Sequence, residues 1–197
     1  MAADDSPNRE DRQVQQVLAA FSESVPRWVA DLVMEGERSA VIVGAAQLDN
    51  VLEQYLLTVL QPQPGSDDKL FGTNGPLRDT YPKINVAYRL GIIDADVERA
   101  LLQLVRKIRN DFAHSMESAS LSEGPQNDRL NELTKLCERN TTYRDVRRGF
   151  TDIANRAELS QSLCDFASVM CVLLMSLASV RSISQRVEPS HRAHLDW

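Results

Sequence analysis

The sequence lacks several features that mark particular classes of protein. It contains only three cysteines, an odd number, and they do not have the spacing of a metal-ligand cluster. We therefore expect no disulfide framework and no bound metal or cofactor, and a reducing compartment fits best. The longest apolar run, residues 167–180, is too short to cross a bilayer and includes Ser176 and Ser179. The first residues are acidic and polar, whereas a secretory signal requires a basic end followed by an apolar run, so we expect a cytoplasmic protein without a membrane anchor.

Basic residues are outnumbered by acidic ones. The chain has 22 lysines and arginines against 28 aspartates and glutamates, which gives a formal net charge of -6. Such a chain as a whole is repelled by nucleic acids, so any contact with RNA requires a local basic patch. The sequence offers two groups of residues for such a patch, Arg106 with Lys107 and Arg144 with Arg147 and Arg148. Both groups also have a purely structural explanation, as cations near a helix end or on a solvated surface.

Apolar residues recur at helical spacing along almost the whole chain, and no segment alternates with the period of a strand for long. We therefore expect an all-α, single-domain helical bundle of about six to seven helices over residues 10–187, with polar tails at residues 1–9 and 188–197. The core is expected from long apolar stripes on three of the helices, which contain Leu52, Leu101 and Leu174.

Proline and glycine residues indicate where helices begin and end. A first helix is expected to stop before Pro26, and a later one has Pro82 in its first turn and ends at Gly91. The segment NTTYRDVRRGF, residues 140–150, is expected to be an irregular basic connection. A shorter helix is expected around Leu130, Leu133 and Leu136, and the long helices are expected at residues 37–61, about 94–114 and about 157–184.

The stretch RKIRNDFAHS, residues 106–115, ends one of these long helices and contains the residues that look most like a functional site. At about 100° per residue, one face of the helix is apolar and should face the core. That face is made by Leu101, Leu104, Val105, Ile108 and Phe112. The opposite side presents a polar line with a spacing of four, made by Arg106, Asn110 and His114, and Arg109 lies nearer the edge of the core.

On a regular helix, Arg109 and His114 point about 140° apart, which is too divergent for both to reach one phosphate. Two arrangements would bring them together. Either the helix loosens after Phe112, or two chains pack with these faces together and build a composite site.

The block from Phe71 to Ile93 resembles the mannitol operon repressor family, in which a glycine-proline-leucine turn leads into a helix that ends in a tyrosine, leucine and glycine cluster. The matching residues here are Gly75, Pro76, Leu77, Ile84, Ala87, Tyr88, Leu90, Gly91, Ile92 and Ile93. The resemblance implies an all-helical regulator that acts through other proteins and has no helix-turn-helix for reading DNA. It implies no catalytic residues, and each residue of the block also has a capping or packing explanation.

A second resemblance begins at Arg109. The pattern here is an arginine, a polar residue, three further positions and a histidine, at the end of a bundle helix. It looks like the signature of the HEPN ribonucleases, which work as dimers with their motifs facing each other. By this resemblance His114 would take the proton of an RNA 2′-hydroxyl, and Arg109 would meet the charge of the phosphorane with two parallel hydrogen bonds. Asn110 would orient the phosphate or the histidine, and the products would be 2′,3′-cyclic phosphates.

Two functions therefore follow from the sequence. The first is a mannitol-repressor-like regulator that acts through protein–protein contacts. The alternative is a metal-independent endoribonuclease of toxin or defence type, with Arg109, Asn110 and His114 in a homodimeric site and RNA as its substrate.

Overall fold

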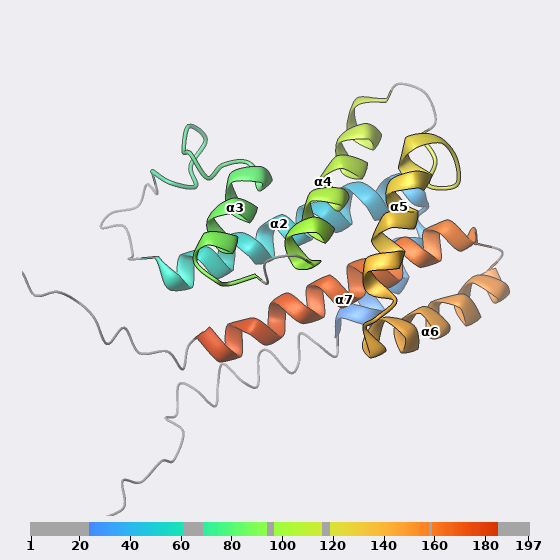
Figure 1. The fold of residues 1–197 in the computed structure, drawn as a ribbon. Helices are drawn as coiled ribbons and strands as arrows, with labels where there is room; N and C mark the ends of the chain where they lie inside the picture. Colours follow the sequence, from blue (N-terminus) through green and yellow to red (C-terminus); the bar gives the residue numbers. More distant parts are fainter. Residues whose placement is uncertain (1–23, 61–68, 94–96, 116–118, 158, 185–197) are drawn as a thin grey trace, which may run out of the picture.

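The computed structural model describes residues 24–60, 69–93, 97–115, 119–157 and 159–184. Throughout these ranges the chain is helical with connecting turns and contains no strand, so the expected all-α bundle is confirmed (Figure 1). A helical segment over residues 24–34 precedes the labelled helices. These are α2 (Glu37–Val59), α3 (Thr80–Arg89), α4 (Val97–His114), α5 (Gly124–Cys137), α6 (Thr141–Ala157) and α7 (Gln161–Ser184).

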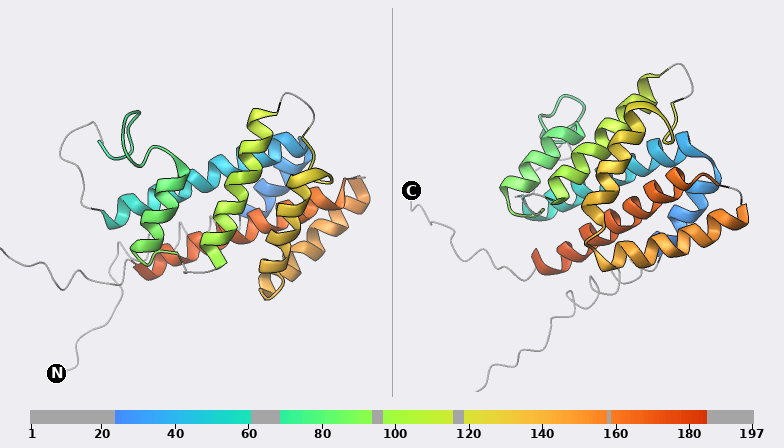
Figure 2. Two further views of the ribbon diagram at one scale, coloured as in Figure 1. Left: turned by 45° about the horizontal axis from the view of Figure 1, so that its top comes forward. Right: turned by 45° about the vertical axis from the view of Figure 1, so that its right-hand side comes forward.

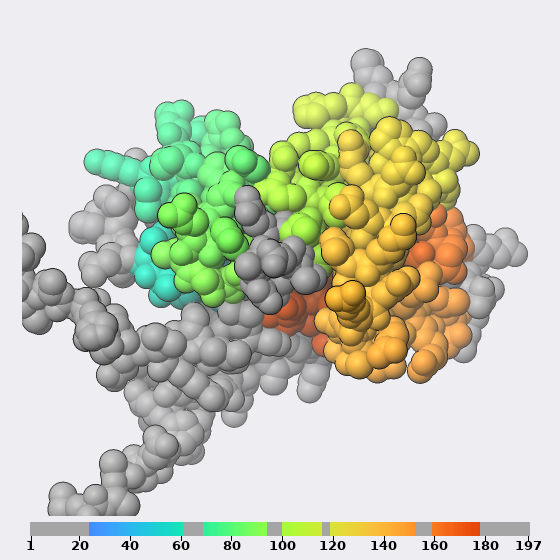
Figure 3. Space-filling view, viewed as in Figure 1, coloured from blue at the N-terminus to red at the C-terminus, as the bar shows by residue number. Residues whose placement is uncertain are grey.

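Helix α7 lies in the middle of the bundle, as its apolar sequence predicted. It packs against α2, α5 and α6, and in Figure 3 only small parts of it are visible beside α5 and α6. Every side chain from Phe166 to Leu174 is buried, because neighbours surround this part of the helix on all sides. The one hydroxyl among them, that of Ser168, donates a hydrogen bond to the carbonyl of Cys164 at 2.7 Å. None of the described helices is long and apolar enough to cross a membrane.

Helices α3 and α4 pack against each other and against α2, so that these three helices form one side of the bundle (Figures 1 and 2). Pro82 lies in the first turn of α3, and Gly91 follows its end with a φ of 69°, in the left-handed region. The amides of Gly91 and Ile92 donate to the carbonyls of Tyr88 and Ala87 at 3.0 and 2.9 Å, which is the Schellman pattern. The predicted ends of this helix are therefore confirmed, and the turn directs Ile92 into the core.

The first residue of α2 is held by two segments that come much later in the chain. The carboxylate of Glu37 accepts a hydrogen bond from the amide of Leu121 at 2.9 Å and another from the hydroxyl of Ser160 at 3.2 Å. Next to it, the guanidinium of Arg38 donates to the carbonyl of Ser115 at 3.1 Å. The start of α2 therefore joins the end of α4 to the segments that precede α5 and α7.

Two expectations about helices differ from the structure. Residues 140–150 do not form an irregular connection but lie almost entirely within α6, where Tyr143 and Phe150 are buried one above the other, seven residues apart. The basic residues that suggested a loop are held outside this apolar face, and Arg147 pairs with Asp165 of α7 through contacts of 2.7 and 3.2 Å. In addition, residues 24–34 form one helical segment that includes Pro26, so no break lies there. The expected first helix around residues 14–21 and the tails at 1–9 and 188–197 lie outside the described residues.

Candidate functional site

The face that α4 turns to the core is the one predicted from the sequence. Leu101, Leu104, Val105, Ile108 and Phe112 are all buried, and Leu102 joins them. The helix stays regular through His114, and the amide of Ser115 still donates to the carbonyl of Asp111 at 2.9 Å. The first of the two arrangements considered above, a helix that loosens after Phe112, is therefore wrong. Within one chain Arg109 and His114 keep their divergent directions.

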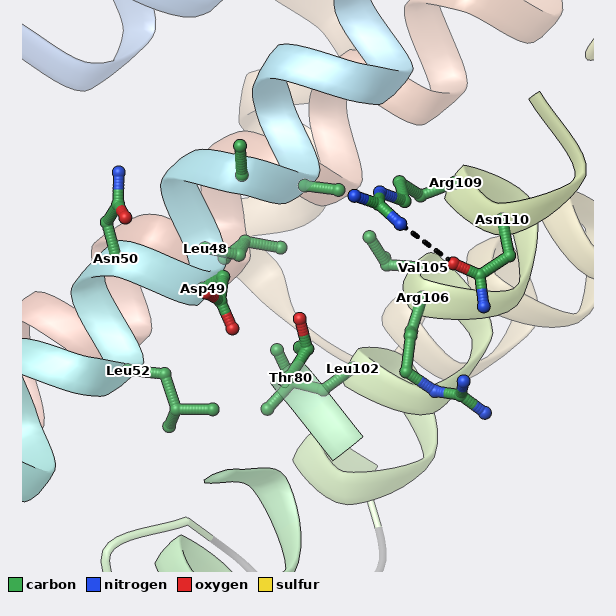
Figure 4. A pocket seen from close by; sticks show the side chains of 12 residues that line it. Leu48, Asp49, Asn50, Leu52, Thr80, Leu102, Val105, Arg106, Arg109 and Asn110 are labelled. Atoms are coloured by element: carbon green, nitrogen blue, oxygen red, sulfur yellow. Dashed lines mark hydrogen bonds between the residues drawn. The ribbon is translucent and has the colours of Figure 1, made fainter. Parts of the chain in front are cut away.

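The polar side of α4 lines a cleft between α2, α3 and α4, which we call the arginine cleft. Its two adjoining parts share the residues Asp49 of α2, Thr80 of α3 and Arg106, Arg109 and Asn110 of α4. The inner part has a volume of about 150 Å³, and the outer part has a volume of about 590 Å³. In Figure 4 the α4 side chains lie on one side of the inner part, and Asp49 lies across from them on α2.

The two arginines that α4 contributes to the cleft are held by neutral groups, whereas Arg78, which lines the outer part, lies 3.5 Å from Asp79. The guanidinium carbon of Arg106 lies 5.2 Å from the ring centroid of Tyr81, and its Nε donates to Gln103 at 3.2 Å. Arg109 donates to the side-chain oxygen of Asn110 at 3.1 Å, the bond drawn in Figure 4. Among the described residues neither arginine forms an ion pair. A guanidinium has five N–H donors, so most donors of both side chains are available to a ligand.

The carboxylate that faces these arginines, that of Asp49, is paired with a buried lysine, which it shares with Glu53. The Nζ of Lys83 lies 2.7 Å from Asp49 Oδ2 and 2.6 Å from Glu53 Oε2, and Lys83 is only 1% exposed. Burial lowers the pKa of Lys83, but the hydrogen bonds with both carboxylates together raise it by more than burial lowers it. The pKa is therefore raised overall, and Lys83 stays charged. This three-residue cluster, Lys83 with Asp49 and Glu53, ties α3 to α2 beneath the cleft.

The other residues predicted for a site lie elsewhere. His114 is exposed at the end of α4 and is not part of the cleft lining, although the Arg38 guanidinium binds the carbonyl of the next residue. Lys107 is exposed and also outside the cleft lining. Arg147 is occupied by Asp165, and the other two arginines of the predicted basic group, Arg144 and Arg148, are exposed. The structure thus brings Arg106, Arg109 and Asn110 together and separates them from His114 and from the α6 group.

Sequence reasoning missed the residues that α2 and α3 contribute to the cleft and the cluster. Asp49 and Glu53 are four residues apart on α2, a spacing that places their carboxylates on one face of the helix. This spacing was the sequence signal that could have predicted an acidic pair in the cluster. Among the described residues no group of histidine, cysteine and carboxylate side chains is arranged to hold a metal ion.

Comparisons with known protein families, with curated proteins and with solved structures give no match for this chain.

Proposed function

We propose that the protein is a regulatory module, similar to the mannitol operon repressors, that acts by binding another protein at the arginine cleft. The observation that carries this proposal is that two separate parts of the sequence meet there. Thr80 and Tyr81 come from the block that resembles the repressors, and Arg106, Arg109 and Asn110 come from the polar side of α4. Tyr81 is 52% exposed, so this part of the block presents a surface and is not used only for packing.

The charges of the cleft favour a partner with acidic groups. Arg106 and Arg109 have no carboxylate partner among the described residues, and their planar forks match the geometry of carboxylates. An exposed tyrosine beside an arginine is also a common composition for the centre of a protein interface. The net charge of -6 opposes binding to the long polyanion of DNA.

The test is complementation of a deletion strain, read out as transcript levels. Deletion of the gene should change the levels of a limited set of transcripts, and the wild-type protein should restore them. The double variant Arg106→Ala/Arg109→Ala should fail to restore them, because it removes the two cleft arginines that have no carboxylate partner among the described residues. Lys107→Ala is the matched control, since it removes an exposed cation from the same helix outside the cleft lining.

A photo-crosslinking residue at position 81 should in addition capture one protein partner, and the same residue at the exposed position 132 on α5 should not. Full restoration of the transcripts by the double variant would contradict the proposal, as would a deletion that changes no transcript.

The endoribonuclease remains the second candidate, because α4 presents the whole motif at the surface of a regular helix. Arg109 and Asn110 lie in the cleft, and His114 is exposed one turn further along. Since one chain does not bring Arg109 and His114 together, the site requires a homodimer in which His114 of a second copy approaches the cleft of the first. His114 would then act as the base for the RNA 2′-hydroxyl, and Arg109 would stabilise the phosphorane.

Purified protein should in this case cleave RNA in the presence of EDTA, and His114→Ala should reduce the rate roughly 10²-fold or more. Arg109→Ala should have a similar effect, whereas Lys107→Ala should cleave as the wild type does. Sedimentation at micromolar concentration should give the mass of a dimer. A monomeric mass, intact RNA or unchanged cleavage by His114→Ala would each remove this candidate and leave the regulatory proposal in place.

A further inference from the structure

We propose that the arginine cleft also binds a small phosphate monoester, which would compete with the partner protein and so control the regulator. This inference rests on the proposal above that the cleft is the recognition site. The ligand would place its phosphate between Arg106 and Arg109 and its body in the inner part of the cleft. Three observations point to this class of ligand: the shape of the inner part, the positive charge of the outer part and the ion pair of Asp49 with Lys83.

The inner part of the cleft has an apolar wall and little room. Its apolar lining comes from α2 and α4, with Ala45, Leu48, Leu52, Leu102 and Val105. A cavity of about 150 Å³ is known to hold one benzene-sized molecule, and the inner part has about this volume. The body of the ligand should therefore be a single ring or a short chain of similar size.

The outer part favours a dianion over a single carboxylate. Arg106 and Arg109 both line it and have no ion-pair partner among the described residues, and the hydroxyl-bearing side chain of Thr80 lines it as well. A phosphate monoester carries a charge of roughly -1.5 to -2 near neutral pH and has three strong acceptor oxygens. Two guanidiniums held in place by Tyr81 and Asn110 can neutralise this charge with little loss of side-chain freedom.

The acidic residues of the cleft do not prevent an anion from binding. Asp49 is paired with the ammonium group of Lys83 at 2.7 Å, which Glu53 shares at 2.6 Å, and Asp79 lies 3.5 Å from the guanidinium of Arg78. The three negative charges of Asp49, Glu53 and Asp79 thus stand against the four positive charges of Lys83, Arg78, Arg106 and Arg109. A long phosphodiester chain extends beyond the cleft and is repelled by the rest of a protein whose overall net charge is -6, whereas a compact monoester stays within the cleft. The geometry therefore favours the small ligand over RNA.

The experiment is titration calorimetry of the purified full chain with three probes at low salt. Phenyl phosphate has the ring and the phosphate, inorganic phosphate has no ring, and phenol has no anion. Phenyl phosphate should bind at least about ten-fold more tightly than inorganic phosphate, because burial of the ring adds to the ionic contacts. Phenol should show no saturable binding.

Variants separate the two parts of the cleft. Arg109→Ala should weaken the binding of phenyl phosphate about ten-fold or more, and Lys107→Ala should leave it unchanged. Ala45→Leu, which places a larger side chain at the inner part, should weaken phenyl phosphate and leave inorganic phosphate unchanged. Circular dichroism of each variant confirms that the helices are intact.

Three results would overturn the inference: phenyl phosphate that binds no more tightly than inorganic phosphate, binding that Arg109→Ala does not weaken, or tighter binding of a mixed-sequence RNA oligonucleotide than of phenyl phosphate. The transcript assay with Arg106→Ala/Arg109→Ala distinguishes failure of the small-ligand inference from failure of the regulatory proposal. If that double variant loses regulation while phenyl phosphate does not bind, only the small-ligand inference falls.

Discussion

Replacement of the buried lysine beneath the arginine cleft should destabilise the protein strongly. Lys83→Met keeps most of the volume of the side chain but removes the ammonium group that lies 2.7 Å from Asp49 and 2.6 Å from Glu53. Asp49 depends on this partner in particular, because its other oxygen, Oδ1, is buried and has no hydrogen-bond partner among the described residues. The variant therefore leaves two neighbouring carboxylates without the cation that compensates them.

The expected loss follows from the burial of the three groups. Removal of one partner from a buried ion pair costs about 3 to 5 kcal/mol. The side chains of Asp49 and Glu53 are 22% and 31% exposed, so water can solvate them in part and the loss should lie at the lower end. A loss of about 3 kcal/mol would lower the melting temperature of a chain of this size by roughly 6 to 12 °C.

The pH dependence of this effect follows from the direction of the pKa shift. The pKa of Lys83 is raised in the folded protein, because its hydrogen bonds to the carboxylates outweigh the larger single effect of burial, which lowers it. The folded state then binds the proton more tightly than the unfolded chain, so this stabilisation is complete below the ordinary pKa of a lysine and is lost as the pH rises through the higher folded value. Between about pH 7 and 9 the ammonium group stays charged, and its contribution should be constant.

Urea unfolding, followed by the helical circular-dichroism signal, measures the free energy of unfolding. The triple variant Lys83→Met/Asp49→Asn/Glu53→Gln should recover most of the loss, because it removes the unpaired charges as well. Lys107→Met, at an exposed lysine, should stay within about 0.5 kcal/mol of the wild type. A Lys83→Met protein that is as stable as the wild type, or a triple variant less stable than Lys83→Met, would refute the reasoning.

Three further predictions concern packing and backbone conformation. Phe112→Ala should cost about 3 to 5 kcal/mol by calorimetry, since the ring is fully buried, and a loss below about 1 kcal/mol would place it outside the core. Gly91→Ala should cost about 1 kcal/mol because of the positive φ, although the new methyl group would contact nothing. Gly149→Ala, within α6, should be neutral or stabilising, and equal effects of the two variants on stability would contradict this prediction. Burial raises the pKa of the thiols of Cys137 and Cys171 to about 11, so a thiol reagent at pH 8 should modify them only after unfolding in urea, and rapid modification of the native protein would show that they are accessible.

The sequence pattern predicted the helices whose apolar stripes are long and missed the one whose stripe is short. In α6 the buried residues Tyr143 and Phe150 are separated by arginines and a glycine, and such a segment folds as a helix only because α7 covers its apolar face. The spacing of these two residues fits a helix, but the basic residues between them are typical of a loop and favour the wrong assignment.

The same limit applies to the candidate site. The polar side of α4 could be predicted from helix geometry, since it depends only on residues of one helix. The approach of Asp49 and Tyr81 could not, because it depends on how α2 and α3 pack against α4. The burial of Lys83 with two carboxylates likewise depends on the packing of α3 against α2, which no single helix determines.

The place of α7 at the end of the described chain has a consequence for the order in which the protein is made. Helix α2 packs against α7, yet about 100 residues separate the end of α2 from the start of α7. At roughly 5 to 20 residues per second, a ribosome needs about 5 to 20 seconds to add them. During this interval the face of α2 around Gly44, which lies beside Met170 of α7, lacks this cover, so the nascent chain must wait for its last described helix before the bundle can close. A chain that ends before α7 should therefore stay unfolded or bind chaperones, however complete the rest of its sequence is.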